Sequence, residues 1–265
     1  MPPKDQAMLT KSQALRLLDS FAPEIPRLYP RPAKDYRARV VDAESVRAYL
    51  ARERHRLAET ATLLPDPSIQ GAPLLEIGIA YGFLSALLNE DAQWRCQGLE
   101  LSENIPVYCP FALDRRIVVH PGKLGAKPLR FSDASFHAVI LAEVLEHLRL
   151  PPRLVFQELK RLLTNGGFLL ITTPNFARLA NFLKLAAGRN PLEPFPDHLV
   201  TEDVTPYLTH IREYTMRELT RLLEQNGFDV RETFYSGCME RGRAHAWISA
   251  IVPPWRGSLV VLARK

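Results

Sequence analysis

The chain has 265 residues, of which 46% are hydrophobic and 24% are charged, a composition that indicates a folded globule rather than a disordered chain. Its 34 basic and 29 acidic residues give a formal net charge of +5, which permits an anionic partner but does not indicate a nucleic-acid-binding stripe. Cys96, Cys109 and Cys238 are far apart and show no CxxC spacing, so neither a disulfide framework nor a cysteine metal site is expected.

The sequence also lacks the apolar segments that direct proteins into or across membranes. No run of about 18 apolar residues, the length of a spanning helix, occurs anywhere, and the first residues, MPPKDQAMLTKSQALRLL, hold no signal-peptide core. Together with the cysteine pattern, this predicts a cytoplasmic protein without a transmembrane segment.

Two amphipathic helices are predicted near the N-terminus, over residues 6–19 and 43–60. The stretch FAPEIPRLYPRP between them is rich in proline, which rules out one continuous helix. We therefore expect residues 1–70 to form a helical cap or extension and residues 71–265 to form the main domain.

From residue 73 onward, short apolar runs alternate with segments of helical periodicity. The apolar runs lack a polar alternation, as strands buried on both faces do. This alternation predicts an α/β fold with a parallel sheet and crossover helices. Strands are predicted over residues 73–79, 94–101, 116–120, 136–142 and 166–174, with helices over 81–90 and 151–163.

The segment after Pro174 is predicted to be a lid insertion, over about residues 175–210, because loops at this edge of such a sheet carry specificity. Its amphipathic part, residues 176–188, could instead contact a lipid-linked substrate or a membrane surface. The rest of the chain is predicted to form a helix over 215–228, closed by Asn226-Gly227, and an antiparallel hairpin of strands over 228–237 and 258–265.

The segment LLEIGIAYGFLSALL joins a predicted strand to a predicted helix through Gly78 and Gly82. Glycines at such a turn let the backbone approach a ligand closely, and the helix N-terminus offers backbone amides. A tight turn also needs glycine for structural reasons alone. Glu100 ends the next predicted strand, where doubly wound folds place an acid that binds a ribose diol. Together these features favour a nucleotide-type cofactor.

Five motifs between residues 70 and 235 carry a family resemblance, in the order LEIGIAYG, GLEL, LRFSDASFHAVILAEVLEHL, ELKRLLTNGGFLLITTPN and HIREYTMRELTRLLEQNGF. In this order they resemble the class I S-adenosylmethionine-dependent methyltransferases. The resemblance implies the Rossmann-like, seven-stranded, mostly parallel sheet of that family, with the last strand antiparallel. It also implies S-adenosyl-L-methionine as the cofactor.

The resemblance further implies which residues would contact this cofactor. Glu76, Gly78 and Gly82 would line its amino-acid end, Glu100 would bind the ribose hydroxyls, and further contacts are implied for Leu101, Ala126 and Ala142. Two positions depart from the family pattern. Ala80 stands where the family usually has the second glycine of GxG, and Gly125-Ala126 replaces an Asp-Ala pair that contacts adenine.

The stretch LAEVLEHLRLPP places Glu143, Glu146 and His147 within five residues. If these residues open a helix, at about 100° per residue their side chains share one face. Two carboxylates and an imidazole could hold a hard divalent ion, which would lower the pKa of an acceptor hydroxyl and fix its orientation. Without a metal, Glu146 and His147 could cap and orient a helix, or His147 could act as a general base.

The ExxEH pattern resembles the metal-dependent O-methyltransferases that act on small-RNA 3′ ends and in ubiquinone biosynthesis. The RNA enzymes also use a second histidine in a segment of the form H-x-x-E-(aromatic)-T, and residues 210–215, HIREYT, match it. The resemblance therefore implies a Mg²⁺ or Mn²⁺ site made of Glu143, Glu146, His147 and His210. It gives His147 and His210 catalytic roles.

The predicted function is metal-assisted O-methylation of a sugar, a glycan or a similar polyhydroxylated molecule, so the expected partner is a small-molecule or oligosaccharide acceptor. The alternatives are a catechol or quinol O-methyltransferase, an RNA 3′-end 2′-O-methyltransferase, and a catalytically silent methyltransferase-like binding module. The charge balance favours a small acceptor over RNA, because an RNA enzyme should carry a denser groove of Lys and Arg. Self-association is left open by the sequence.

Overall fold

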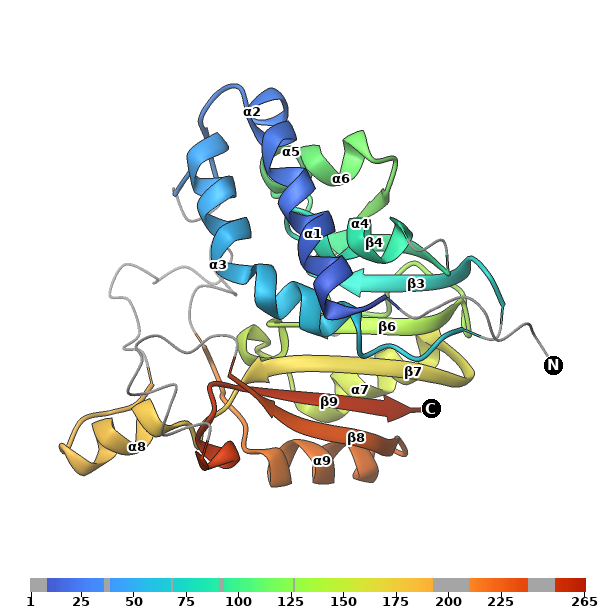
Figure 1. Cartoon of the computed structure of the whole chain (residues 1–265). Helices are drawn as coiled ribbons and strands as arrows, with labels where there is room; N and C mark the ends of the chain where they lie inside the picture. Colours follow the sequence, from blue (N-terminus) through green and yellow to red (C-terminus); the bar gives the residue numbers. More distant parts are fainter. Residues whose placement is uncertain are drawn as a thin grey trace. The chain divides into compact units, whose positions relative to one another are not determined.

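Figure 1 shows the computed structural model, which describes residues 9–35, 39–67, 69–90, 93–125, 127–192, 210–237 and 251–265. The strands of its central sheet are β3 (Ala72–Ile77), β4 (Trp94–Glu100), β5 (Val118–Pro121), β6 (Phe136–Ala142), β7 (Leu163–Pro174), β8 (Asp229–Ser236) and β9 (Ser258–Arg264). The seven strands follow the order β5-β4-β3-β6-β7-β9-β8. A separate two-stranded sheet pairs β1 (Ala33–Lys34) with β2 (Val40–Val41).

The pairing of these strands confirms the predicted α/β fold with a mostly parallel sheet. The pairs β3–β4, β4–β5 and β6–β7 are parallel, whereas β9 runs antiparallel to both β7 and β8. The two C-terminal strands therefore form the predicted antiparallel pair at one edge. Strand interiors such as Leu74, Leu75 and Ile140 are fully buried, which explains why the apolar runs show no polar alternation.

The described residues form two compact units, one up to Pro121 and the other from Gly122 onward. The first unit holds β3, β4 and β5, together with all the helices that precede residue 121. These helices are α1 (Lys11–Phe21), η1 (Ala22–Glu24), α2 (Ile25–Leu28), α3 (Ala43–Ala61), α4 (Phe83–Glu90), α5 (Ile105–Tyr108) and α6 (Pro110–Asp114).

Side-chain caps set where the two long N-terminal helices begin. Thr10 accepts a hydrogen bond from the backbone N–H of Gln13 before α1, and Asp42 accepts one from Ser45 before α3, so both helices open with capping boxes. Of the prolines between them, Pro23 and Pro26 lie in the first turns of η1 and α2, where a missing N–H costs nothing, and Pro30 and Pro32 follow α2 outside any helix. Both predicted helices are confirmed, although the first begins at Lys11 and not at residue 6, because Thr10 caps it. Short helical turns occupy part of the proline-rich stretch between them.

Aromatic packing joins the N-terminal helix α1 to helices α4 and α6. The rings of Phe21 and Phe83 lie 5.2 Å and 4.6 Å from that of Phe111, measured between centroids, and all three side chains are buried. The guanidinium of Arg115 lies 4.3 Å from the centre of the Phe21 ring. The described residues up to 70 thus share one compact unit with β3, β4 and β5, and the division into compact units falls at residue 121. The domain boundary expected at residue 70 stays a prediction.

The second unit contains β6, β7, β8 and β9 with the remaining helical segments. These are η2 (Leu145–His147), α7 (Pro152–Leu162), α8 (Leu179–Ala186), α9 (Met216–Gln225) and η3 (Pro253–Trp255). Thr215 caps α9 by accepting from the N–H of Glu218, and Gly227 follows the helix with φ +76°, as the Asn-Gly signal predicts.

The structure describes only part of the predicted lid. Helix α8 begins five residues after β7, whereas residues 193–209 of the lid and Ala126 among the predicted cofactor contacts lie outside the described residues. None of the helices in the described segments combines the length and the apolar character that crossing a bilayer would require.

Candidate functional site

The turn after β3 adopts the left-handed backbone that its glycines predict. Gly78, Ala80 and Gly82 have φ values of 74°, 48° and 79°. A Cβ atom at Gly82 would lie 2.6 Å from the Cβ of Ala112, so this position needs glycine for space as well as for conformation. Ala80 keeps the backbone shape of the glycine that it replaces, at a cost of about 1–2 kcal/mol for a left-handed alanine.

The carboxylate of Glu100 joins this turn to the end of β4. One oxygen accepts the backbone N–H of Ala80 at 3.0 Å, and the other accepts the N–H of Leu101 at 2.9 Å and the side-chain amide of Asn104 at 3.0 Å. The predicted ribose-binding acid is thus held in place by three donors. Asn104 is a contact that the sequence reasoning missed, although its place four residues after the acid, just before α5, could have signalled it.

Glu76 lies inside β3 and is 5% exposed. Burial raises the pKa of its carboxyl to about 7, although the hydroxyl of Ser85 donates a hydrogen bond to it at 2.5 Å. The side chain is therefore close to half-protonated near neutral pH, and a cation such as an ammonium group would favour its ionised form. Ser85, in the first turns of α4, was also missed by the sequence reasoning.

The acidic stretch after β6 does not open an α-helix. Glu143 has φ +54°, a left-handed conformation that ends the regular backbone of β6, and a single 3₁₀ turn, η2, follows. The carboxylate of Glu143 accepts a hydrogen bond from the hydroxyl of Thr172 at 2.9 Å. Ala142, a predicted cofactor contact, is the last residue of β6 and pairs with Thr172. The shared helix face expected for Glu143, Glu146 and His147 is therefore absent.

The structure instead brings Glu146, His147 and His210 together. Each offers one ligand atom, and these three atoms lie within 4.8 Å of one another, a group that does not include Glu143. The imidazole rings of His147 and His210 are 5.0 Å apart between centroids, and the Nε2 atom of His147 lies 3.8 Å from a carboxylate oxygen of Glu146. A buried oxygen and two ring nitrogens at such distances could hold a metal ion.

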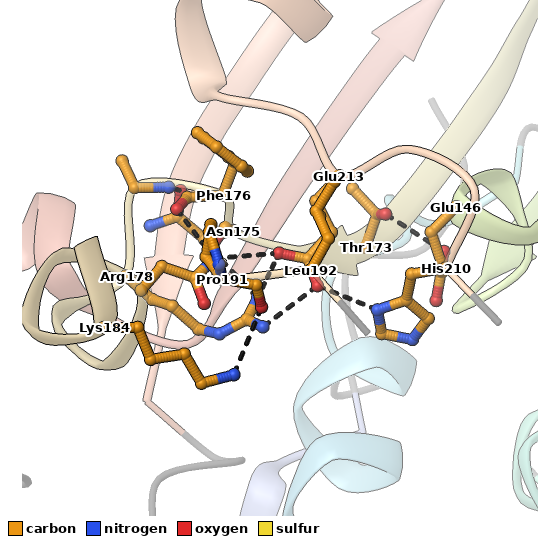
Figure 2. Close-up of polar contacts among 12 residues, drawn as sticks. Glu146, Thr173, Asn175, Phe176, Arg178, Lys184, Pro191, Leu192, His210 and Glu213 are labelled. Carbon is orange, nitrogen blue, oxygen red and sulfur yellow. Dashed lines mark hydrogen bonds and ion pairs between the residues drawn. The ribbon is translucent and has the colours of Figure 1, made fainter. Parts of the chain in front are cut away.

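Backbone hydrogen bonds bring His210 to this turn from a distant part of the sequence. The carbonyl oxygen of Glu146 accepts the N–H groups of Ile211 and Arg212, at 2.7 Å and 3.2 Å. The side chain of Glu146 is 1% exposed and accepts the hydroxyl of Thr173 at 3.0 Å, a contact drawn in Figure 2. Both β7 and the segment before α9 therefore shape the cluster.

Glu213 is the second carboxylate of this region, and the sequence reasoning gave it no role. Its side chain accepts from Nδ1 of His210 at 2.8 Å and from two nitrogens of Arg178 at 2.6 Å and 2.9 Å (Figure 2). Burial opposes its ionisation, but the hydrogen bonds from His210, Arg178 and Asn181 outweigh burial and lower the pKa of Glu213 below its ordinary value. Its place in the H-x-x-E motif was the available signal.

Comparison with known proteins identifies the class that this fold and these two sites define. Residues 43–233 match the family profile described as "Methyltransferase domain" (Methyltransf_23), which is more than half of the chain. The chain therefore belongs to this methyltransferase family, and its fold is that of the class I S-adenosylmethionine-dependent methyltransferases.

Individual relatives agree with this assignment. Over 164 residues, 62% of the chain, it is 33% identical to a probable S-adenosylmethionine-dependent methyltransferase of Mycolicibacterium smegmatis, and it spans 54% of the length of that relative. A methyltransferase structure from Mesorhizobium loti matches 81% of this chain and 98% of its own, with 17% identity and a TM-score of 0.52. Phosphoethanolamine N-methyltransferase 2 of Haemonchus contortus, in complex with S-adenosyl-L-methionine, matches 75% of this chain and 50% of its own, with 15% identity and a TM-score of 0.51. At these identities the two structures show a common fold.

Proposed function

We propose that this chain moves the methyl group of S-adenosylmethionine to a hydroxyl oxygen of a sugar, a glycan or a similar polyhydroxylated small molecule, with the help of a divalent ion. The observation that carries this proposal is the group of ligand atoms from Glu146, His147 and His210 within 4.8 Å of one another. Glu146 and His147 follow the carboxyl end of β6, at the sheet edge where α/β proteins bind their ligands, and His210 reaches them from the segment before α9.

The donor set suits a divalent ion with mixed oxygen and nitrogen ligands. Mg²⁺ prefers oxygen alone, so of the two predicted ions Mn²⁺ fits two imidazoles and one carboxylate better. When bound, such an ion would lower the pKa of an acceptor hydroxyl and hold a neighbouring oxygen. Other residues of the chain orient the proposed ligands: Thr173 donates to one oxygen of Glu146, and Glu213 accepts from Nδ1 of His210.

Glu143 is proposed as a fourth ligand, although its carboxylate is held by Thr172 in this structure. That hydroxyl occupies one of its two carboxylate oxygens, as Thr173 occupies one oxygen of Glu146, so the other oxygen of Glu143 is the one proposed to bind the ion. Comparing Glu143→Gln with Glu146→Gln tests this point directly. If both variants lose Mn²⁺ affinity to a similar extent, Glu143 is a ligand, whereas a loss confined to Glu146→Gln would restrict the site to three side chains.

The central experiment is an activity screen of the full chain with labelled cofactor against sugars, nucleosides and catechols. After treatment with EDTA, turnover should disappear and should return on addition of Mn²⁺ or Mg²⁺. Glu146→Ala and His147→Ala should abolish turnover and leave the Kd for S-adenosylmethionine nearly unchanged. Full activity in EDTA would overturn the metal role and would return His147 to general-base or orienting duty. Absence of cofactor binding at millimolar concentration would instead indicate a catalytically silent module.

One observation favours a second acceptor class, a quinol or a lipid-linked molecule. The side chains of Phe182, Leu183 and Leu185 on α8 are 55%, 55% and 53% exposed, and the ring of Phe182 stacks on Trp255 with centroids 6.0 Å apart. An exposed apolar helix face after β7 suits an apolar acceptor or peripheral contact with a membrane surface. Phe182→Ser should then lower turnover on a vesicle-embedded acceptor and spare a water-soluble one. Equal losses on both would remove this candidate.

A further inference from the structure

The carboxylate of Glu213 is the centre of a buried polar network behind His210. Its side chain is 2% exposed and accepts from Nδ1 of His210 at 2.8 Å. Arg178 donates to both of its oxygens, at 2.6 Å and 2.9 Å, and the side-chain amide of Asn181 donates at 3.1 Å. Figure 2 shows Arg178 and His210 meeting Glu213 from different segments of the chain. Such a carboxylate has little freedom to move.

These contacts determine which nitrogen of His210 carries the proton. The two-pronged ion pair with Arg178 keeps Glu213 ionised, and an ionised carboxylate only accepts hydrogen bonds. Nδ1 of His210 must therefore be the donor. A neutral imidazole protonated at Nδ1 presents the lone pair of Nε2, which is the form that binds a metal ion, and the contact also fixes the orientation of the ring.

The network reaches His210 from the segment that follows β7. Arg178 is the N-cap residue of α8, and Asn181 lies in its first turn. The backbone N–H of Phe176, in the same segment, donates to the carbonyl of Tyr214 at 2.9 Å, next to Glu213. The start of α8 is therefore tied to the histidine segment by backbone as well as by side chains.

We infer that Glu213 is a positioning residue for the metal centre, and that Arg178 acts on that centre through Glu213. This inference rests on the proposed function, since it concerns the same ion. It gives the segment after β7 a second role besides covering the acceptor, because the start of α8 supports a ligand of the ion.

The test is Mn²⁺ binding to the full chain, measured by electron paramagnetic resonance without cofactor or acceptor. Glu213→Ala should weaken Mn²⁺ binding by about 10–100-fold, the usual effect of losing the partner of a metal-bound histidine. Glu213→Gln keeps an acceptor but loses the charge, so its effect should be smaller. Arg178→Met should also weaken Mn²⁺ binding. The double variant Arg178→Met/Glu213→Gln should bind Mn²⁺ as tightly as Glu213→Gln alone, because Arg178 affects the ion only through Glu213.

Glu218→Gln is the matched control. This nearby carboxylate forms an ion pair with Arg212, so the variant removes one charge from the same region without a contact to His210. Its Mn²⁺ affinity should equal that of the wild type. Glu213→Ala leaves Arg178 without its partner, so the fold of each variant is checked by circular dichroism. If Glu213→Ala does not fold, the Mn²⁺ affinity of Glu213→Gln is compared with that of the wild type instead.

Nitrogen-15 NMR of labelled histidine gives a readout that needs no metal. His210 should show the Nδ1-protonated tautomer in the wild type and should lose this preference in Glu213→Ala. Unchanged Mn²⁺ affinity and an unchanged tautomer in both Glu213 variants would overturn the inference and leave the proposed function standing. A wild type that binds no Mn²⁺ would overturn the metal-assisted function and, with it, the role of Glu213 at a metal centre.

Discussion

The buried carboxyl of Glu76 should make the stability of the cofactor-free protein fall as the pH rises. Burial raises its pKa from 4.5 to about 7, against the hydrogen bond from Ser85. Between these two pH values the native state holds a proton that the unfolded chain releases. The contribution of Glu76 to stability is therefore fully present below about pH 4.5 and is lost as the pH rises to about 7.

The expected magnitude follows from the size of this pKa shift. A rise from 4.5 to about 7 corresponds to about 3 kcal/mol, at about 1.4 kcal/mol per pKa unit. Glu76→Gln removes the titration and keeps an acceptor for the hydroxyl of Ser85. The free energy of unfolding of the variant, relative to that of the wild type, should therefore rise by about 3 kcal/mol from about pH 4.5 to pH 8. Urea unfolding at both pH values measures this difference.

Glu158→Gln is a control of opposite sign. Burial opposes the ionisation of Glu158, but hydrogen bonds from Arg161 and from the N–H of Leu129 outweigh burial and lower its pKa. A lowered pKa gives stability that is present above the unfolded value and lost as the pH falls. Glu158→Gln should therefore cost more stability at about pH 8 than at about pH 4.

An identical pH dependence of stability in Glu76→Gln and in the wild type would refute the reasoning for Glu76.

The proposed contact of Glu76 with the amino-acid end of the cofactor gives the same variant a second readout. The ammonium group of S-adenosylmethionine favours an ionised carboxylate, so below about pH 7 binding must release the proton of Glu76. The Kd of the wild type should then rise by up to about tenfold per pH unit on acidification, and that of Glu76→Gln should stay nearly level. A level profile in the wild type would mean that Glu76 does not bind this group.

Three further predictions concern the turn after β3 and the carboxylate of Glu146. Gly82→Ala should lower the free energy of unfolding by about 2–4 kcal/mol, because the new Cβ meets Ala112 at 2.6 Å and the backbone is left-handed; a thermal melt within about 1 kcal/mol of the wild type would contradict this. Ala80→Gly should raise the free energy of unfolding by up to about 1 kcal/mol, because the strain energy relieved exceeds the free-energy cost of the more flexible unfolded chain. A loss of stability in urea unfolding would show that the side chain of Ala80 is needed. Thr173→Val should weaken Mn²⁺ binding about 10-fold, because it removes the hydroxyl that donates to Glu146, whereas Thr173→Ser should not. Electron paramagnetic resonance measures both affinities, and equal values in the two variants would remove Thr173 from the site.

The parts of the fold that the sequence predicts well are those that local patterns decide. The apolar run of β6 is buried on both faces, so its bounds, Phe136–Ala142, coincide with the predicted strand. Helix α9 begins after Thr215 because the hydroxyl of this residue accepts a backbone N–H of the first turn. It ends before Gly227 because glycine readily adopts the left-handed conformation that terminates a helix. These signals lie within a few residues of the features they determine.

The division into compact units depended on contacts that no local pattern reveals. The amphipathic helices before residue 61 are predicted to be a cap because the alternation of apolar runs and helical segments begins only at residue 73. In the structure, Phe21 at the end of α1 packs on Phe111 in α6, which lies 90 positions further along the chain. The partner of an apolar helix face is set by tertiary packing, and the sequence shows only that such a face exists.

The cluster after β6 shows the same limit at the level of single side chains. All four proposed ligands, Glu143 included, could be chosen from motifs, but the shared face expected for Glu143, Glu146 and His147 rested on a helical backbone. The left-handed conformation of Glu143 turns the chain at that point, and nothing in a glutamate predicts it. What brings His210 to Glu146 is a pair of backbone hydrogen bonds to a carbonyl oxygen, and backbone groups are the same at every position of a sequence. The sequence therefore identifies the proposed ligands by residue type and motif, whereas their geometry depends on a turn and on a carbonyl that only the structure shows.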